Sequence, residues 1–365
     1  MLSTTSLKQT PLHKEHLLLK AKMVPFGVWE MPLQYDGILA EYEYTRKDVS
    51  IFDTSHMGEF FIDGDAKDSG LDRIVTQTIA DMPVKTCRYG LTLNEQGGAI
   101  DDLIVYRLSQ ERWMIVVNGA TTEKDAKHFL KHLTTKGKFD NRSDKLGKLD
   151  IQGPRSREIL RSLVEDIEKL DYYTFDEFEV LGQRVIVSRT GYTGELGFEI
   201  YFPWERTVDL WREILKRGGK PAGLGARDVL RIEMGYPLYG HELEENISPL
   251  DAGLNKFIDW NKDFLGKAAL EKVKTKGQHR QAIAFISMNR RSPRAEKKIF
   301  STDGKTIGVV TSGSFSPALN RGIGLGMVAR DSVARGQKIF WGDENDKLEA
   351  EIASRPFYKN GSFKK

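Results

Sequence analysis

Two adjacent carboxylates, Asp101 and Asp102, stand in an otherwise apolar stretch that runs NEQGGAIDDLIVY from Asn94 to Tyr106. The two glycines supply the backbone freedom of a tight turn, and 100–108 then alternates as a strand. At a period of two, Asp102 shares a face with Tyr106 and Asp101 lies on the other face. A buried acid is costly unless a cation or a donor meets it. The local pattern leaves two interpretations open: a structural pair, which it favours, in which Asp101 ends the turn and Asp102 holds a loop, or a reactive acid.

Other residues with chemistry to offer are an acid in the apolar strand FEIYF, two arginines and several tyrosines: Glu199, Arg227, Arg355, Tyr89, Tyr106, Tyr172 and Tyr192. A buried Glu–Arg pair can be purely structural. The same set also suits a flat heterocycle that carries a pendant carboxylate. An acid accepts from ring N–H groups, tyrosines pack against the ring, and arginine binds carboxylates with two parallel hydrogen bonds.

Several familiar chemistries are excluded by spacing. His128 and His132 have a metal-ligand spacing, but lysines share the helix and no HExxH glutamate accompanies them, so a solvated face is favoured and no metal site is expected. The segment GLGARD at Gly223 fits neither a dinucleotide fingerprint nor a Walker loop. The segment GYTGE at Gly191 lacks the nucleophile of a hydrolase elbow. Cys87 has no base nearby in sequence and is interpreted as a small buried hydrophobe.

Composition places the chain among ordinary globular proteins. It has 365 residues, 39% of them hydrophobic and 29% charged. The 55 basic and 52 acidic residues leave a net charge of +3, which is too small to predict nucleic-acid binding. One cysteine fits a reducing compartment, and no window approaches the ~18 apolar residues of a membrane span. The basic, hydroxyl-rich start is interrupted by Glu15 and lacks a secretory core, so we expect a cytoplasmic protein.

The elements that must position these residues follow from hydrophobic period and turn signals. In the first part we expect helices at 11–23, 37–46, 66–76 and 121–133, an irregular aromatic stretch at 26–35, and strands at 50–53, 58–62, 87–93, 100–108 and 112–117. A new unit begins near Lys148, where strands and helices alternate as in an α+β split-βαβ arrangement. Beyond Lys274, short strands separated by turn residues predict a small all-β domain.

Eight sequence words, in order, resemble the T-protein family of the glycine cleavage system, the tetrahydrofolate-dependent aminomethyltransferases. They are TPLHKEHLLLKAKMVPFGVWEMPLQY, FDTSHMGEF, NEQGGAIDDLIVYR, VSRTGYTGELGFEIY, PAGLGARDVLRIEMGYPLYGHEL, NKDFLGKAAL, GVVTSGSFSPALN and RPFY. The resemblance implies an α+β, three-domain cloverleaf. Its parts would be a ferredoxin-like domain at 1–50 and 148–245, an α+β domain at 51–147 and 246–274, and a β-barrel or jelly roll at 275–365.

The resemblance also implies a site between the domains and a reaction. The co-substrate would be tetrahydrofolate, and the one-carbon unit would arrive as an aminomethyl group on the lipoyl arm of a partner, the H-protein, with ammonia released. Asp102 would be the catalytic acid nearest the folate nitrogens, and Asp101, facing away from it, would be structural. The folate-binding residues would be Met57, Tyr89, Asp102, Tyr106, Asn118, Tyr172, Tyr192, Glu199, Arg227 and Arg355.

Small departures and two rival functions accompany this resemblance. Val28 stands where the family usually has glycine, and Thr54 where it often has an aliphatic residue. One rival is a folate-dependent demethylase of the same fold, and another is a folate-binding assembly factor without catalysis. The segment from Asn261 to Leu265 lacks the cysteine motif of the folate-binding iron–sulfur repair proteins, which lowers the second rival.

Overall fold

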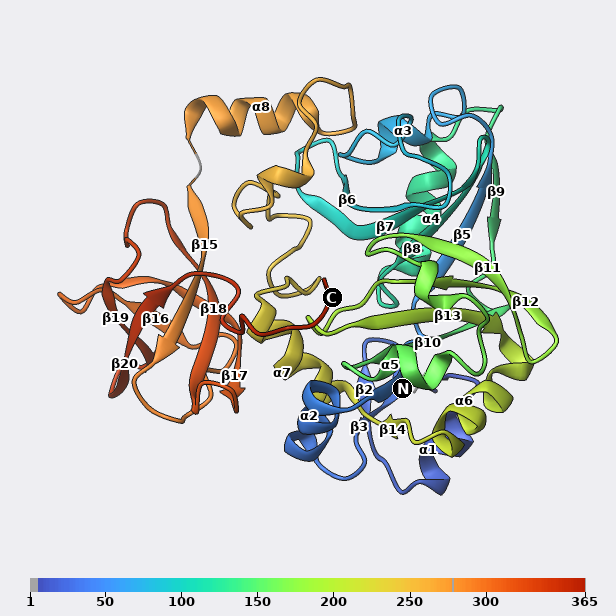
Figure 1. Ribbon diagram of the computed structural model, residues 1–365. Helices are drawn as coiled ribbons and strands as arrows, with labels where there is room; N and C mark the ends of the chain where they lie inside the picture. The colour runs from blue at the N-terminus through green and yellow to red at the C-terminus, as the bar shows by residue number, and fades with distance from the viewer. Residues whose placement is uncertain (1–5, 278, 365) are drawn as a thin grey trace.

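The computed structural model describes residues 6–277 and 279–364, and its strands form three sheets and one closed barrel (Figure 1). Helices cover the outer faces of the two larger sheets, as the expected α+β class requires. None of the helices in this described part is long and apolar enough to cross a membrane.

The five-stranded sheet carries the two adjacent acids. Its order is β6 (Cys87–Leu93), β7 (Ala99–Ser109), β8 (Arg112–Val117), β5 (Gly58–Asp63) and β9 (Lys138–Asn141). The predicted turn joins β6 to β7, and Asn94 Oδ1 accepts from the amides of Gln96 and Gly98. Helices α3 (Leu71–Ile74) and α4 (Thr122–His132) cover one face around Leu103 and Phe129. The helix predicted at 66–76 is therefore much shorter than expected.

The six-stranded sheet faces the other side of the five-stranded one. Its order is β11 (Phe175–Val180), β12 (Gln183–Ser188), β13 (Gly197–Pro203), β10 (Leu146–Gln152), β4 (Ser50–Asp53) and β14 (Lys220–Pro221). Helices α5 (Ser156–Leu160) and α6 (Thr207–Lys216) pack on its outer face with Ile151 and Phe198. Its inner face meets the first sheet through Tyr201 and Tyr106. Cys87 lies in this inner layer and is 7% exposed, which confirms its prediction as a buried residue.

The first fifty residues differ most from expectation. The stretch predicted to be irregular contains β3 (Trp29–Gln34), which pairs with β2 (Lys22–Phe26) and β1 (Lys8–Gln9). The helix predicted at 11–23 ends early, as α1 (His13–Leu18), whereas α2 (Ile38–Lys47) is close to expectation. Prolines in β2 and β3 hide the strand signal, because proline normally argues against a strand. The register of the β2–β3 pairing shifts between Lys22 and Met23, and Met23 pairs with Pro32.

The predicted all-β region is a closed barrel of β15 (Arg280–Ser287), β18 (Arg321–Ala329), β17 (Thr306–Ser316), β16 (Lys298–Phe300), β19 (Lys338–Asp343) and β20 (Asp346–Ala353). Helix α8 (Lys267–Lys276) precedes it, and α7 (Leu224–Met234) packs against its strands. Short 3₁₀ turns lie at Ile167–Lys169, Trp204–Arg206 and Asn255–Phe257. In Figure 1 the barrel stands to one side, and the chain after β20 returns from it toward the two facing sheets.

Candidate functional site

Asp102 lies on the face of β7 that looks toward the six-stranded sheet. Its Oδ2 accepts a hydrogen bond of 2.9 Å from the hydroxyl of Tyr89, and its Oδ1 accepts one of 2.9 Å from the side-chain amide of Asn118. No cation pairs with it among the described residues. Burial, and then the charge of Asp101, raise the pKa of Asp102 to about 7. This carboxyl is therefore poised to gain or lose a proton near neutral pH.

Asp101 stands directly behind Asp102 and is fully buried. It accepts from the backbone amide of Asn118 at 2.9 Å, from its side-chain amide at 2.8 Å, and from the hydroxyl of Thr121 at 2.9 Å. The two carboxylates start on opposite faces of the strand, yet both bind the same Asn118 amide. Asp101 thereby orients the group that holds Asp102, which is more than the separate structural role predicted for it.

A third acid, Asp125 on α4, completes this group. Burial, and then the charge of Asp101, raise the pKa of Asp125 to about 10. Burial also raises the pKa of Asp101, although its bonds to Asn118 and Asp125 oppose the rise. At neutral pH Asp125 therefore keeps its proton, because burial and the neighbouring Asp101 outweigh the opposing effect of the Thr121 hydroxyl on its pKa.

A second group of buried charges lies on the six-stranded sheet. Lys148 on β10 donates to Asp150 at 2.9 Å and to Glu199 on β13 at 2.5 Å. Arg227 on α7 donates to the other oxygen of Asp150 at 2.7 Å. Burial opposes ionisation of Asp150, but Lys148 and Arg227 overcome it and lower its pKa. Burial raises the pKa of Glu199 against the opposing effect of Lys148.

Aromatic rings continue from this charged group. The guanidinium carbon of Arg227 lies 4.9 Å from the ring centre of Tyr192, and Tyr192 stacks on Tyr236 with centres 5.6 Å apart and planes 25° apart. Tyr236 and Tyr172 line the same small cavity. Burial raises the pKa of the Tyr192 hydroxyl, the Arg231 guanidinium opposes this rise, and the charge of Asp102 adds to it. The two acid groups therefore flank one aromatic region.

The remaining predicted residues lie around this region in different ways. Met57 packs at the inner layer, and its sulfur is 3.7 Å from the Lys148 ammonium. Tyr106 is fully enclosed, and its hydroxyl lies 2.9 Å from that of Tyr201 and 3.4 Å from Glu199. Arg355, which follows β20, is half-buried and donates to the Gly235 carbonyl at 3.4 Å. Tyr106 thus helps to fix the position of the Glu199 carboxylate through this hydrogen bond.

The sequence interpretation missed Lys148, Asp150, Asp125 and Tyr236. A signal existed for the first two, because KLDIQ places a lysine and an aspartate on one face of an otherwise apolar strand. Asp125 looked like an ordinary charge in the first turn of a helix, where acids are favoured. Within residues 6–277 and 279–364 no group of three or more His, Cys, Asp or Glu side chains is arranged to hold a metal ion.

Comparison with known proteins identifies the family of this fold. Residues 12–262 match the GCVT N-terminal domain, and residues 280–359 match the glycine cleavage T-protein C-terminal barrel domain. Aminomethyltransferases from Pseudothermotoga lettingae and Phocaeicola vulgatus are each 41% identical to the chain; the alignments cover 98% and 97% of it, and 99% and 100% of those proteins. The crystal structure of glycine cleavage system aminomethyltransferase T from Bartonella henselae matches with a TM-score of 0.93 at 31% identity, over 98% of this chain and 100% of that one.

The mixed α/β fold with its closed C-terminal barrel is the fold of these one-carbon transferases. The chain belongs to the glycine cleavage T-protein family, and it is an enzyme of the aminomethyltransferase class. The fold class inferred from the resemblance is confirmed. The exact domain boundaries and the roles of individual site residues stay predictions.

Proposed function

We propose that this protein transfers a one-carbon unit from an aminomethyl-lipoyl group to tetrahydrofolate, with release of ammonia. The lipoyl group would be carried by the H-protein of the glycine cleavage system. One observation carries the proposal: Asp102 is held by two neutral donors, beside an aromatic region, with its pKa raised to about 7. Such a carboxylate can orient an amine and stabilise positive charge that develops next to it.

The residues of the site fit a reduced pterin with a carboxylate-bearing tail. Tyr89 and Asn118 occupy one lone pair on each oxygen of Asp102, so further lone pairs remain for ring or amine N–H donors. Tyr192 offers a ring face, and Arg227 lies against it. Arg355, with one long bond to a carbonyl, has donors left for a carboxylate.

Each group would have its own task. Asp102 would orient the reacting nitrogen and stabilise the cationic carbon centre as the transfer proceeds. Glu199, fixed by Lys148, would accept from the pterin edge with the lone pair that its protein partners leave open. The tyrosines would exclude water, which strengthens these electrostatic interactions.

Tetrahydrofolate would supply the nucleophilic amine, so the protein needs no covalent nucleophile of its own. The single cysteine agrees with this, because burial raises the pKa of the Cys87 thiol far above its ordinary value and the thiolate is the reactive form. Asp102 is then the residue on which the chemistry depends.

The test is ammonia release from an aminomethyl-lipoyl H-protein, measured with and without tetrahydrofolate. We expect release to depend on both, and we expect sulfur- and nitrogen-methyl donors to give no methylated or one-carbon folate product. Turnover with the methyl donors but not with the aminomethyl carrier would assign the protein to the demethylase alternative. Folate binding without turnover of either donor would favour an assembly factor.

A further inference from the structure

The segment Phe357–Lys364 leaves the barrel and lies against the site from outside. Its first residues, Phe357 and Tyr358, donate their amides to the carbonyl of Glu233 at the end of α7, at 2.8 and 3.0 Å. The ring of Tyr358 lies 3.9 Å from the guanidinium carbon of Arg46, which is itself paired with the Glu233 carboxylate at 2.7 Å. The beginning of the segment is therefore fixed by a buried ion pair.

Its end is fixed to the loop that carries Tyr192. Ser362 is buried, and its amide donates to Glu195 at 2.9 Å, while its hydroxyl donates to the same oxygen and accepts from the Leu196 amide at 2.9 Å. A Cβ added to Gly361 would lie 2.1 Å from the Gly194 carbonyl oxygen. Only glycine therefore permits the two backbones to approach this closely.

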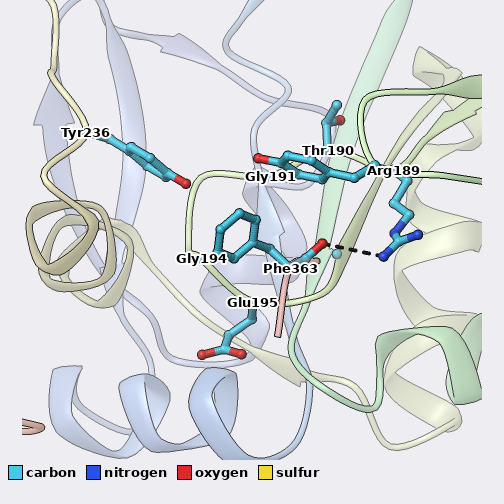
Figure 2. A pocket seen from close by; sticks show the side chains of 9 residues that line it. Arg189, Thr190, Gly191, Gly194, Glu195, Tyr236 and Phe363 are labelled. Carbon is cyan, nitrogen blue, oxygen red and sulfur yellow. Dashed lines mark hydrogen bonds between the residues drawn. The ribbon is translucent and has the colours of Figure 1, made fainter. Parts of the chain in front are cut away.

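Phe363 then enters the aromatic region itself. Figure 2 shows its ring between Tyr236 and Arg189, which directly follows β12, with Glu195 below it. Its ring centre is 5.4 Å from that of Tyr172, at an interplanar angle of 65°. The packing leaves a cavity of only about 10 Å³ among these side chains, about enough for one water molecule.

A continuous path of contacts therefore joins Phe363 to the charged group. It runs from Phe363 to Tyr172, on to Tyr236, which lines the same small cavity, through the stacked pair to Tyr192, and on to Arg227. Half-buried rings of this kind need support from behind if they are to present a fixed surface to a ligand. Phe363 touches the first ring of the path, and its carbonyl accepts from the guanidinium of Arg189 at 3.4 Å.

We propose that the segment Phe357–Lys364 is a strap that fixes the aromatic wall of the folate site, with Phe363 as a positioning residue that acts through Tyr172. The inference rests on the function proposed above. The affinity for tetrahydrofolate would then depend on Phe363, which lies more than a hundred positions along the sequence from the tyrosines of that wall. Because the strap does not reach Asp102, it is expected to affect binding and leave the chemical step unchanged.

Two variants and two controls test the strap. We expect Phe363→Ala to raise the Kd and the KM for tetrahydrofolate about 5–10-fold, with kcat and the KM for the aminomethyl carrier unchanged. Phe363→Leu, which keeps apolar volume and folds even if the alanine variant does not, is expected to give a smaller rise of about threefold. The control Lys359→Ala, at an exposed position of the same segment, is expected to leave the Kd unchanged.

A second control separates positioning from general stability. Ile339→Val, in the core of the barrel, is expected to lower the Tm without changing the Kd for tetrahydrofolate. A rise in Kd for both Phe363 variants but not for Ile339→Val would support the strap. Equal Kd values for wild type and both Phe363 variants would overturn the strap alone. A wild-type protein that binds no tetrahydrofolate would overturn both the strap and the proposed function.

Discussion

The two groups of buried acids, one on each of the facing sheets, are held in opposite ways. On the five-stranded sheet, Asp102 is surrounded by the neutral donors of Tyr89 and Asn118, and burial raises its pKa to about 7. On the six-stranded sheet, Asp150 is paired with Lys148 and Arg227, and its pKa is lowered despite complete burial. The same type of side chain is therefore titratable in one group and permanently charged in the other.

This difference separates two kinds of work. A carboxylate locked between cations is a fixed charge, which can hold neighbouring groups in place at any physiological pH. A buried carboxylate with only neutral partners has a charged form of high free energy. A cationic reacting group beside it lowers that free energy. We therefore expect the Lys148 group to govern stability and Asp102 itself to govern turnover, and the predictions below test how far this division holds.

The largest effect is expected on the fixed-charge side. Lys148→Met removes the shared partner of Asp150 and Glu199, so it leaves two buried carboxylates with one cation between them. We expect the free energy of unfolding to fall by about 3–5 kcal/mol, measured by urea denaturation at pH 7. The exposed neighbour Lys145 is the control, and Lys145→Met is expected to change stability by less than about 0.5 kcal/mol. A Lys148→Met protein as stable as wild type would show that the Lys148 group does not govern stability.

The next effect is on turnover. Asp102→Asn keeps the shape of the side chain and removes its charge, so we expect kcat to fall by about 10²–10³, with folding retained. The exposed Asp303→Asn, on the barrel, is expected to leave turnover unchanged. If the Asp102 variant stayed within about threefold of wild type, a difference in activation free energy under ~0.7 kcal/mol, the assigned role would be wrong.

The pH profile of the wild type sharpens the same test. Since the ionised form is the one that stabilises positive charge, kcat/KM should rise with pH through the pKa of Asp102, near 7 in the free protein. The Asp102→Asn variant should lack this rise. A wild-type rate that falls across the same range would instead make Asp102 a proton donor.

The smallest effect concerns the proton stored at Asp125. Its pKa is raised to about 10 in the folded state, so the folded carboxyl keeps a proton that the unfolded one loses above about pH 4. This contribution to stability is complete at low pH and is lost as the pH rises toward the folded pKa. Asp125→Asn imitates the shape and neutrality of the protonated acid and removes its titration. We expect the decline of unfolding free energy between pH 7 and pH 9 to become shallower by about 1 kcal/mol per pH unit.

The matched control lies two residues earlier on the same helix. Glu123→Gln, at an exposed position, is expected to leave that decline as it is in the wild type. Urea denaturation at three pH values measures both variants. An Asp125→Asn protein with the wild-type slope would show that the Asp101–Asp125 pair does not hold its proton in the native state.

Much of the frame was predictable from local pattern. The turn at Asn94 and the paired strands around it were found because glycine geometry and the alternation of side chains are properties of a few consecutive residues. The strand pair near Met23 and Pro32 was missed, because two prolines there hide pairing that is set by partner strands. The sequence pattern marks Lys148 only as the start of a new unit, whereas the structure gives it two acid partners.

The sequence by itself determined the acids, the arginines and the aromatic rings available, the strands that present them on alternating faces, and the family to which the chain belongs. The tertiary structure decided which acid meets a cation and which meets only neutral donors, and it brought Phe363 to Tyr172 across the fold. The physical reason is that the ionisation of a buried group depends on its solvation and its nearest charges, and both are supplied by residues distant in the chain.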